Sequence, residues 1–374
     1  MKKKILITYA KYGSGHESIA KYICDYLITH NKSYEVMLLD MTPYANISGK
    51  FGINIMKFVG KYRPEKIFDF CYNISDNKLT SSISKKYALR SFDNAKLRRT
   101  IKSFDPDITI SSHFYCSNII AEYNKLGLIS SKIVTIITDY HSHETWTCNH
   151  KNENAYIVSN DVVKKELIKR GVSRNKIYPF GIPLSKREEL KTKENILNKY
   201  RVNNGEKNIL FFGGSSVGSL YYYDYLKIFL KLNRDFNIIF VSGHNIKLKN
   251  KVQTLVRKEG YKNVRVLGYT KDVFNLLKIS SLVITKPGGA TVTECLEFKV
   301  PMLLVPGVGG QEKYNARYVF LKRYGVYAKN KRRFKKLSTS IINNPRILDF
   351  YRKNLMNQDK NECLKKINNL IKRM

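Results

Sequence analysis

The sequence has few acidic residues, scattered cysteines and no long apolar run. Its six cysteines form no C-x-x-C pair, which argues against a disulfide framework or a cysteine-based zinc site and fits a reducing cytosol. No apolar run approaches the roughly 18 residues that a transmembrane helix needs. The apolar stretch after the first lysines is too short for a signal peptide, because Lys11 ends it. If the protein works at a membrane, we therefore expect it to lie on the surface.

Acidic residues number only 30, against 67 lysines and arginines, and the formal net charge is +37. Such a chain is attracted to polyanions, namely nucleic acid, anionic lipid headgroups or acidic substrates, and charge alone does not choose among them. The basic residues are spread along the whole chain, and no nucleic-acid-binding module is recognisable. A basic, tyrosine-rich protein that coats nucleic acid is nevertheless the alternative outside the enzymes.

Strand-like runs alternate with helical stretches along a chain of 374 residues, which is too long for one ordinary core. The runs look buried on both faces, as parallel strands do. They cover residues 4–10, 34–40, 107–112, 132–138 and 155–160, and then 208–214, 237–243, 264–269, 282–289 and 301–307. The pattern predicts an α/β protein with two doubly wound, Rossmann-like domains facing across a cleft, where ligands bind at the carboxyl ends of the strands.

A stiff "FGIP" followed by a charged polar stretch marks the predicted domain boundary. We assign residues 1–184 to an N-terminal domain, 185–345 to a C-terminal domain and 346–374 to a basic helical tail that crosses back. Residues 44–104 interrupt the alternation by mixing apolar and basic side chains. Two interpretations stay open for this insert. It is an amphipathic helical insert that packs on its own domain, or a segment whose apolar residues enter a membrane interface while its lysines meet anionic lipid.

The segment 285–319 carries the strongest chemical signal, with the order strand, glycine turn, helix, strand, glycine loop, helix. The turn at 287–289 opens a helix whose first amides are free for an anion, and Thr291 and Thr293 add hydroxyls near that end. Glu294 lies in the first turns of the helix, where a carboxylate is suited to hold the two hydroxyls of a ribose. The second loop supplies polar groups fit to read sugar hydroxyls, namely Gln311, Glu312 and Asn315.

These motifs resemble the glycosyltransferases related to monogalactosyldiacylglycerol synthases, processive diacylglycerol glucosyltransferases and the lipid II-forming enzyme of peptidoglycan synthesis. The resemblance extends to "GSGHESIA", "TDYHSHETW" and "FFGGSSVG". It implies a GT-B fold, a UDP-hexose donor with glucose favoured over galactose, and an inverting transfer without metal or cofactor. It also implies a diacylglycerol or glycosyldiacylglycerol acceptor, a peripheral position on the anionic cytoplasmic face of the cell membrane, and no nucleic-acid partner.

The residues and the resemblance together define the expected site. Two of these residues each have two interpretations. Lys286 either approaches a phosphate or is an ordinary surface lysine. Trp146 either forms an apolar wall for the acceptor or belongs to the core. Tyr12 departs from the small residue that many relatives carry. The donor-binding set is Gly214, Ser215, Ser216, Gly268, Tyr269, Lys286, Gly288, Gly289, Thr291, Glu294, Gly310, Gln311, Glu312 and Asn315. The acceptor-side set is Gly13, Gly15, His143 and Trp146, with His16 and Asp139 as the catalytic residues.

An inverting transfer needs a base for the acceptor hydroxyl, and a histidine with an ordinary pKa of about 6.5 suits that task. His16 is the first candidate, Asp139 is the second base or the group that orients His16, and a role for His16 in capping the loop stays open. His141, His143, Cys148 and His150 fall within ten positions but fit no zinc spacing. A sugar-nucleotide epimerase would share the two-domain architecture, although it would not need the basic insert.

Overall fold

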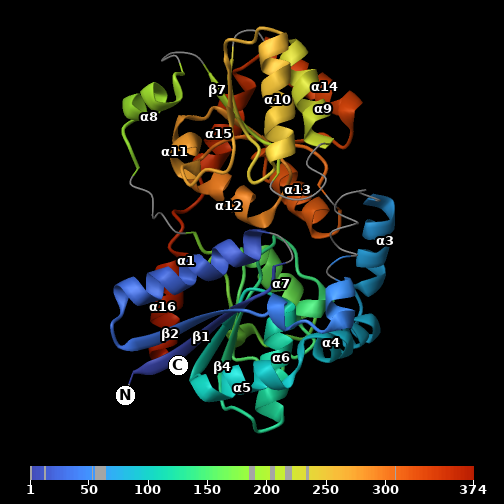
Figure 1. Cartoon of the computed structure of the whole chain (residues 1–374), viewed down its shortest axis with the longest axis vertical. Coiled ribbons are helices and arrows are strands. Elements are labelled where there is room, and N and C mark those ends of the chain that lie inside the picture. The colour runs from blue at the N-terminus through green and yellow to red at the C-terminus, as the bar shows by residue number, and fades with distance from the viewer. Residues whose placement is uncertain are drawn as a thin grey trace. The chain divides into compact units, whose positions relative to one another are not determined.

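The computed structural model describes residues 2–11, 14–52, 54, 65–184, 190–202, 207–214, 221–232, 236–307 and 309–374. The chain divides into two compact units. Unit 1 comprises the described residues of Met1–Lys57 and Glu65–Ser185 together with Asn361–Met374, and unit 2 comprises those of Lys186–Lys360. Each unit holds one six-stranded sheet with helices packed around it (Figure 1).

The sheet of unit 1 has the strand order β2-β1-β3-β4-β5-β6, and all neighbouring strands are parallel. The strands are β1 (Lys3–Tyr9), β2 (Tyr34–Asp40), β3 (Ile108–Ser111), β4 (Lys132–Ile136), β5 (Ala155–Ile157) and β6 (Ile177–Tyr178). Strand β1 has a partner on either side, so Ile5, Leu6 and Ile7 are fully buried, as in other parallel sheets covered on both faces.

Asparagine caps start several helices of unit 1, because a short side-chain acceptor satisfies an amide of the first turn. Asn77 accepts from the amide of Thr80, and Asn94 accepts from that of Leu97. The helices and short turns are α1 (Ser14–His30), η1 (Thr42–Tyr44), α3 (Glu65–Ser75), α4 (Lys78–Phe92), α5 (Ala95–Phe104), α6 (Phe114–Lys125), η2 (Glu144–Trp146), α7 (Asp161–Lys169), η3 (Arg174–Lys176) and α16 (Cys363–Arg373).

Helix α16 brings the last residues of the chain back to the first sheet. In Figure 1 this red helix lies beside α1 and the blue strands β1 and β2. Ile367 and Ile371 are fully buried, and the ammonium of Lys3 donates to the carbonyl oxygen of Ile371 at 3.2 Å. The side-chain amide of Asn361 donates to the carbonyl oxygen of Ile182 at 2.8 Å, within the "FGIP" segment. The expected return of a C-terminal helix is therefore confirmed.

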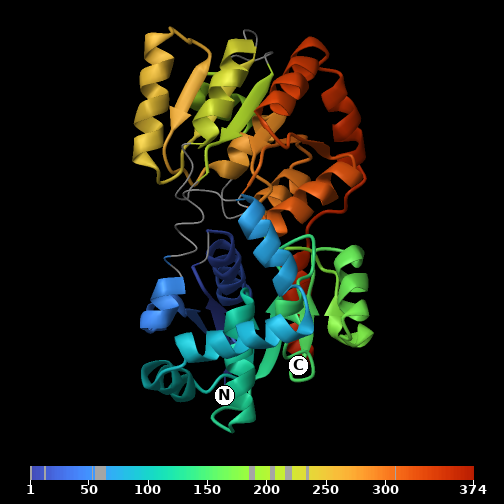
Figure 2. The ribbon, with the colours of Figure 1, turned by 90° about the vertical axis from the view of Figure 1, so that its right-hand side faces the viewer.

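The insert at 44–104 divides its apolar residues between the core and the surface. Its second half packs inward, since Phe92, Leu97 and Ile101 join a buried cluster with residues of α6. Its middle does the opposite, because apolar side chains of α3 and α4 such as Phe70 and Leu79 are largely exposed. Helices α3 and α4 are seen in blue and cyan in Figure 2. The packing interpretation therefore holds for the second half of the insert, and the membrane interpretation stays a prediction for its exposed middle.

The sheet of unit 2 has the order β12-β11-β10-β7-β8-β9, again all parallel. The strands are β7 (Asn208–Phe212), β8 (Asn237–Val241), β9 (Val264–Leu267), β10 (Leu282–Thr285), β11 (Met302–Leu304) and β12 (Gly325–Tyr327). The helices are α8 (Lys193–Tyr200), α9 (Tyr221–Leu232), α10 (Ile246–Lys258), α11 (Val273–Ile279), α12 (Gly289–Glu297), α13 (Gln311–Leu321), α14 (Lys331–Asn343) and α15 (Ile347–Met356).

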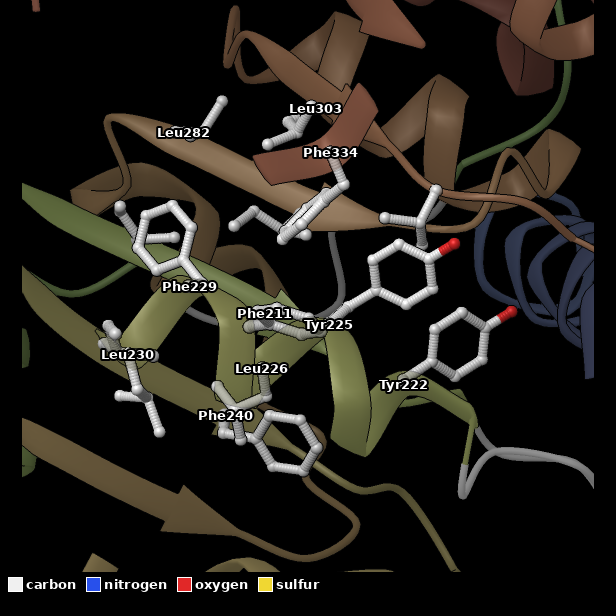
Figure 3. Close-up of a cluster of buried hydrophobic side chains, with 14 of the residues drawn as sticks. Phe211, Tyr222, Tyr225, Leu226, Phe229, Leu230, Phe240, Leu282, Leu303 and Phe334 are labelled. Carbon is white, nitrogen blue, oxygen red and sulfur yellow. The ribbon is translucent and has the colours of Figure 1, made fainter. Parts of the chain in front are cut away.

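Aromatic side chains fill the core between the unit 2 sheet and its helices (Figure 3). Phe211 on β7 and Phe240 on β8 pack with ring centroids 5.5 Å apart. Tyr225 of α9 meets Phe334 of α14 edge to face at 4.9 Å, which ties two helices to one another. This core fixes the strand ends from which the loops of unit 2 begin.

Candidate active site

His16 lies in the first turn of α1, directly after Gly15, at the carboxyl edge of the unit 1 sheet. Its Nδ1 is 2.7 Å from the carbonyl oxygen of Ser112, which follows β3. The Oγ1 of Thr138, which follows β4, is 3.3 Å from the same nitrogen. The hydroxyl of Ser112 also donates to the carbonyl oxygen of His16 at 3.0 Å. The ends of three neighbouring strands therefore hold one imidazole.

The hydrogen bond with Ser112 determines which nitrogen of His16 carries the proton. A carbonyl oxygen only accepts, so Nδ1 is protonated and donates to it. In the neutral ring, Nε2 then presents a lone pair, and no described residue hydrogen-bonds to that nitrogen. An imidazole held in this tautomer is arranged to take a proton from a neighbouring hydroxyl group.

Two opposing effects set the protonation of His16. Burial lowers the pKa of His16 below 6.5, while the negative charge of Asp139 and the hydrogen bond to Ser112 raise it again without restoring it. His16 is therefore neutral at neutral pH, as a general base must be. Asp139 is partly buried, and its carbonyl oxygen accepts from the hydroxyl of Ser159 at 3.0 Å. The structure thus brings the two predicted catalytic residues together.

His113 adds a second imidazole that the sequence analysis did not single out. Its ring meets His16 edge to face with the centroids 4.7 Å apart, and its Nδ1 accepts from the amide of Tyr115 at the start of α6. Burial lowers the pKa of His113 well below its usual value, so the ring contributes a neutral dipole and no charge. Its position directly after a predicted strand, at 107–112, is the signal that could have identified it.

His143 and Trp146 serve the structure of the loop that follows Asp139. Nε2 of His143 donates to the carbonyl oxygen of Tyr72 at 3.0 Å, and its Nδ1 accepts from the amide of Thr145 at 3.2 Å. Both nitrogens are occupied, the ring is buried, and burial lowers the pKa of His143. Trp146 belongs to the buried cluster with Ile137, so the structure places it in the core.

Arg170 ties this loop to the corner between α3 and α4. Its guanidinium donates to Asp76 at 2.9 Å, to Glu144 at 2.8 Å and to the hydroxyl and carbonyl oxygens of Ser142. Burial is the largest single effect and raises the pKa of Asp76, but the hydrogen bonds from Arg170 and from the amide of Glu144, together with nearby positive charge, outweigh it, so that the pKa is lowered. Glu166 accepts from the amide of Ser142 at 2.8 Å and contacts His141 at 3.1 Å. Among the described residues, no group of three or more histidines, cysteines and carboxylates is placed to hold a metal ion.

At the carboxyl edge of the unit 2 sheet, a glycine turn leads from β10 into the first turn of α12. Gly288 precedes α12 in extended conformation, and space is open where a β-carbon would stand. Thr291 lies in the first turn and Glu294 in the second, both partly buried. The hydroxyl of Thr293 donates to the carbonyl oxygen of Gly289 at 2.8 Å, which leaves Thr291 as the hydroxyl nearer the helix start. The first amides of this nine-residue helix are arranged for an anion.

Lys286, Glu312 and Asn315 lock the two glycine loops of unit 2 together. The ammonium of Lys286 pairs with a carboxylate oxygen of the buried Glu312, and the side-chain amide of Asn315 donates to the carbonyl oxygen of Pro287 at 3.0 Å. A β-carbon at Gly307 would overlap the end of the Glu312 side chain, so a larger residue at this position would displace that carboxylate. Gln311, which is partly buried, begins α13 after Gly310. Lys286 thus has a carboxylate partner within unit 2, and its approach to a phosphate stays a prediction.

The ends of β7, β8 and β9 complete the same edge of the sheet. Gly214 has φ of +75°, a left-handed conformation that favours glycine. Tyr269, after Gly268, is 58% exposed, and its ring stacks on that of His244 with centroids 4.1 Å apart and an interplanar angle of 15°. His244 was not predicted, although it follows the strand run 237–243 directly. Tyr12, Gly13, Ser215 and Ser216 lie outside the described residues.

Comparison with protein families matches both halves of the chain. Residues 16–184 match the family described as monogalactosyldiacylglycerol (MGDG) synthase, and residues 208–374 match the glycosyltransferase family 28 C-terminal domain. The processive diacylglycerol beta-glucosyltransferase of Bacillus cereus is 29% identical over 333 residues, which cover 84% of this chain and 79% of that protein. The protein of the same name from Bacillus mycoides is 29% identical over 332 residues, with the same coverage.

Solved structures of low identity share the fold. MurG of Acinetobacter baumannii aligns with a TM-score of 0.64 at 14% identity over 100% of both chains. The MnaA–UDP structure from S. aureus gives 0.65 at 15% identity, over 99% of this chain and 96% of that one. The UDP-GlcNAc 2-epimerase of Neisseria meningitidis gives 0.61 at 11% identity, over 99% and 100%. The predicted GT-B fold is therefore confirmed.

Glycosyltransferases and epimerases both occur among these structural neighbours, so the fold alone does not separate the two activities. The family matches favour transfer of a sugar, because residues 16–184 match the MGDG synthase family and residues 208–374 match a glycosyltransferase domain. The chain belongs to the glycosyltransferases that join an MGDG synthase N-terminal region to a family 28 C-terminal domain, and it is an enzyme of that class.

Proposed function

We propose that the enzyme transfers a hexose, with glucose as the first candidate, from a UDP-sugar to diacylglycerol or to a glycosyldiacylglycerol. The likeness to processive diacylglycerol beta-glucosyltransferases over 84% of the chain carries this proposal. The chemistry of the two sheet edges is consistent with it. Unit 1 offers a base for a hydroxyl acceptor, and unit 2 offers an anion-binding helix start.

The acceptor step uses His16. Its Nε2 takes the proton of the acceptor hydroxyl while that oxygen attacks the anomeric carbon of the donor, and the bond from this carbon to the diphosphate breaks. The protonated imidazole is stabilised by the charge of Asp139, which raises the pKa of His16 against the effect of burial. Attack opposite the departing diphosphate inverts the anomeric centre.

The departing diphosphate gains negative charge, and two features of unit 2 are placed to stabilise that charge. The free amides at the start of α12 and the ammonium of Lys286 stand at the ends of the same central strands. Glu294 then holds the ribose, and the stacked pair of Tyr269 and His244 provides an aromatic surface for the uracil ring. Gln311, the first residue of α13, reads the sugar hydroxyls.

Membrane contact is proposed for the α3–α4 surface, defined by Phe70, Ile74, Leu79 and Ile83. Their side chains are 66%, 48%, 74% and 60% exposed, and each helix contributes a pair spaced four residues apart. An apolar stripe of a helix normally faces a core, so an exposed one marks an interaction surface. The exposed Lys78, Lys86 and Arg90 flank this stripe, which suits an anionic interface. No helix of the described residues meets the length and hydropathy needed to cross a membrane.

Labelled sugar transfer tests the function directly. The protein is incubated with labelled UDP-glucose or UDP-galactose and vesicles that contain diacylglycerol, and the lipids are then separated. We expect label in a glycolipid with UDP-glucose, retained when EDTA is present, and the opposite anomeric configuration in the product by NMR. Label in neither reaction, or release of a free epimerised sugar nucleotide, would contradict the proposal.

Vesicle flotation tests the α3–α4 surface. The double variant Leu79→Ser/Ile83→Ser is expected to float with anionic vesicles at least fivefold less, because two exposed apolar side chains lose their burial in the interface. The control is Phe320→Ser/Leu321→Ser on α13, which removes side chains of 58% and 64% exposure. Equal loss in both variants would show that this surface has no special role.

A further inference from the structure

A groove of about 550 Å³ runs between α9 and α10 of unit 2. The two helices, in yellow-green and yellow, lie next to one another in Figure 1. Its floor includes Tyr223, Leu255 and Tyr261, which pack against the unit 2 core. Four lysines line its walls, Lys227 and Lys231 from α9 and Lys251 and Lys258 from α10. No residue of the predicted donor or acceptor sites belongs to this groove.

The charge of the groove is not neutralised by the protein. Its one lining carboxylate is Glu259, which forms no ion pair with the lysines in the part of the chain that the structure describes. Lys251 and Lys227 instead lie over the ring of Tyr223, at 4.3 and 5.7 Å from its centroid. Ammonium groups that lie close together without carboxylate partners repel one another. An anion that binds between them therefore reduces an electrostatic repulsion that is present in the free protein.

The spacing of the lysines favours a surface that carries several phosphates. Lys227 and Lys231 are one helical turn apart, and Lys251 and Lys258 are two turns apart, about 10 Å along the axis. Lysine binds phosphate as a point charge without the fixed two-pronged geometry of arginine, which suits headgroups that are free to move. The apolar floor between the lysines fits the glycerol part of a lipid.

Single-stranded nucleic acid fits the groove less well. Such ligands bind by stacking their bases on open aromatic faces. The ring of Tyr223 has ammonium groups over it, and Tyr261 is partly buried against the core. The groove therefore attracts phosphates without offering a stacking platform.

The lysines also lie away from the donor edge of unit 2. A helix that follows a parallel strand runs back towards the amino end of the sheet. Lys231 is the eleventh residue of α9, and Lys258 ends α10, so both lie near the amino end of the sheet. Occupation of the groove thus leaves the start of α12 free.

We propose that the α9–α10 groove binds the phosphate headgroups of anionic lipids and gives unit 2 a membrane contact of its own. The choice of lipid as the source of the phosphate rests on the proposed function, since a lipid acceptor brings the enzyme to a phospholipid surface. Unit 2 is then held at the membrane by charge, whereas the α3–α4 surface of unit 1 acts through apolar side chains.

The test uses the full chain and vesicles of phosphatidylcholine with or without phosphatidylglycerol. The variant Lys227→Gln/Lys231→Gln/Lys251→Gln/Lys258→Gln is expected to bind the anionic vesicles at least tenfold more weakly, because each lysine near such a surface contributes measurably to binding. The matched control is Lys322→Gln/Lys335→Gln/Lys336→Gln/Lys353→Gln, which removes four exposed lysines elsewhere in unit 2. We expect less than a threefold loss for the control.

Further arms identify the source of the phosphate and separate this proposal from the proposed function. Millimolar glycerol phosphate or inorganic phosphate should not displace the protein at constant ionic strength, and a single-stranded oligonucleotide should bind both variants equally. Sugar transfer to detergent-dispersed diacylglycerol should be unchanged in the groove variant. Equal vesicle loss in both variants, displacement by the soluble phosphates, or selective loss of oligonucleotide binding would overturn the proposal. Absence of sugar transfer in the unmodified protein would instead reject the proposed function.

Discussion

The carboxyl edges of the two sheets differ in the chemical groups that they present, side chains in unit 1 and backbone amides in unit 2. In unit 1, the edge presents the imidazole of His16, which is held by the carbonyl oxygen of Ser112 and lies beside the hydroxyl of Thr138. In unit 2, glycines bring the backbone of Gly288 and the following helix start into the open. The same parallel topology therefore supports one edge that presents side chains and another that presents amides.

This difference follows from the chemistry that each edge is proposed to perform. A hydroxyl acceptor must lose a proton, and among the ordinary side chains histidine changes charge near neutral pH. A diphosphate must only be bound as its charge grows, and backbone amides do so without titrating. Four substitutions test how far this division holds.

His16→Ala is expected to have the largest effect, a loss of turnover of about 100- to 10,000-fold, because it removes the proposed base. The affinity for UDP, measured by calorimetry, should stay unchanged, because UDP is proposed to bind at the carboxyl edge of the unit 2 sheet. His30→Ala provides the control, since this exposed histidine ends the same helix. If the His16 variant loses UDP affinity as strongly as turnover, the proposed division of roles between the two edges is wrong.

Glu294→Ala is expected to weaken UDP binding by about 10- to 100-fold, since a hydrogen bond to a charged group is worth about 1.5–3 kcal/mol. Calorimetry with UDP measures the effect, and circular dichroism verifies the fold. Glu297→Ala, one turn later on α12, is the matched control and should bind UDP normally. Unchanged affinity in the Glu294 variant would place the ribose elsewhere.

Arg170→Gln is expected to lower the free energy of unfolding by about 1–3 kcal/mol, because Asp76 and Glu144 lose a shared partner. Urea denaturation measures this change. Arg174→Gln, at an exposed position in η3, should change stability by less than about 0.5 kcal/mol. Similar stability of the two variants would show that the loop after Asp139 does not depend on this network.

Asp139→Asn is expected to have the smallest effect on the best rate and a clear one on its pH dependence. The charge of Asp139 raises the pKa of His16, so its removal lowers that pKa further below 6.5. The acidic limb of kcat/KM, where His16 becomes protonated, should therefore move to lower pH. If turnover instead disappears at every pH, Asp139 is the base and His16 its partner.

Continuous apolar runs in the sequence predicted most strands, because a central strand of a parallel sheet is apolar along its whole length. The ten strand runs all appear in the sheets, as "KILITYA" does in β1. The strands β6 and β12 were missed; both are short edge strands, and neither lies in a longer strand-like run of the kind that predicted the three-residue strands β5 and β11. The insert was ambiguous for a physical reason, since its apolar residues serve both a core and a surface.

The site was predictable to the extent that function depends on strand ends. His16 and Asp139 were predicted from the resemblance of "GSGHESIA" and "TDYHSHETW" to family motifs; the charge of Asp139 acts on His16, and their catalytic roles stay predictions. The engagement of His143 with Tyr72 and the pairing of Lys286 with Glu312 depend on residues distant in sequence, which no local pattern reveals. His113 and His244 were missed although both follow strands directly, because a single histidine in a loop carries little signal without its neighbours.

The return of α16 to unit 1 has a consequence for the order of events during synthesis. Ile367 and Ile371 belong to the interior of unit 1, so that interior stays incomplete until almost the whole sequence has left the ribosome. Unit 2 ends by Lys360 and is complete before then. Although chains are made from the amino end, unit 2 is therefore free to fold first. Unit 1 completes its interior only when α16 is made, after more than 170 intervening residues. Pulsed proteolysis of stalled nascent chains would reveal this inversion as early protection of unit 2.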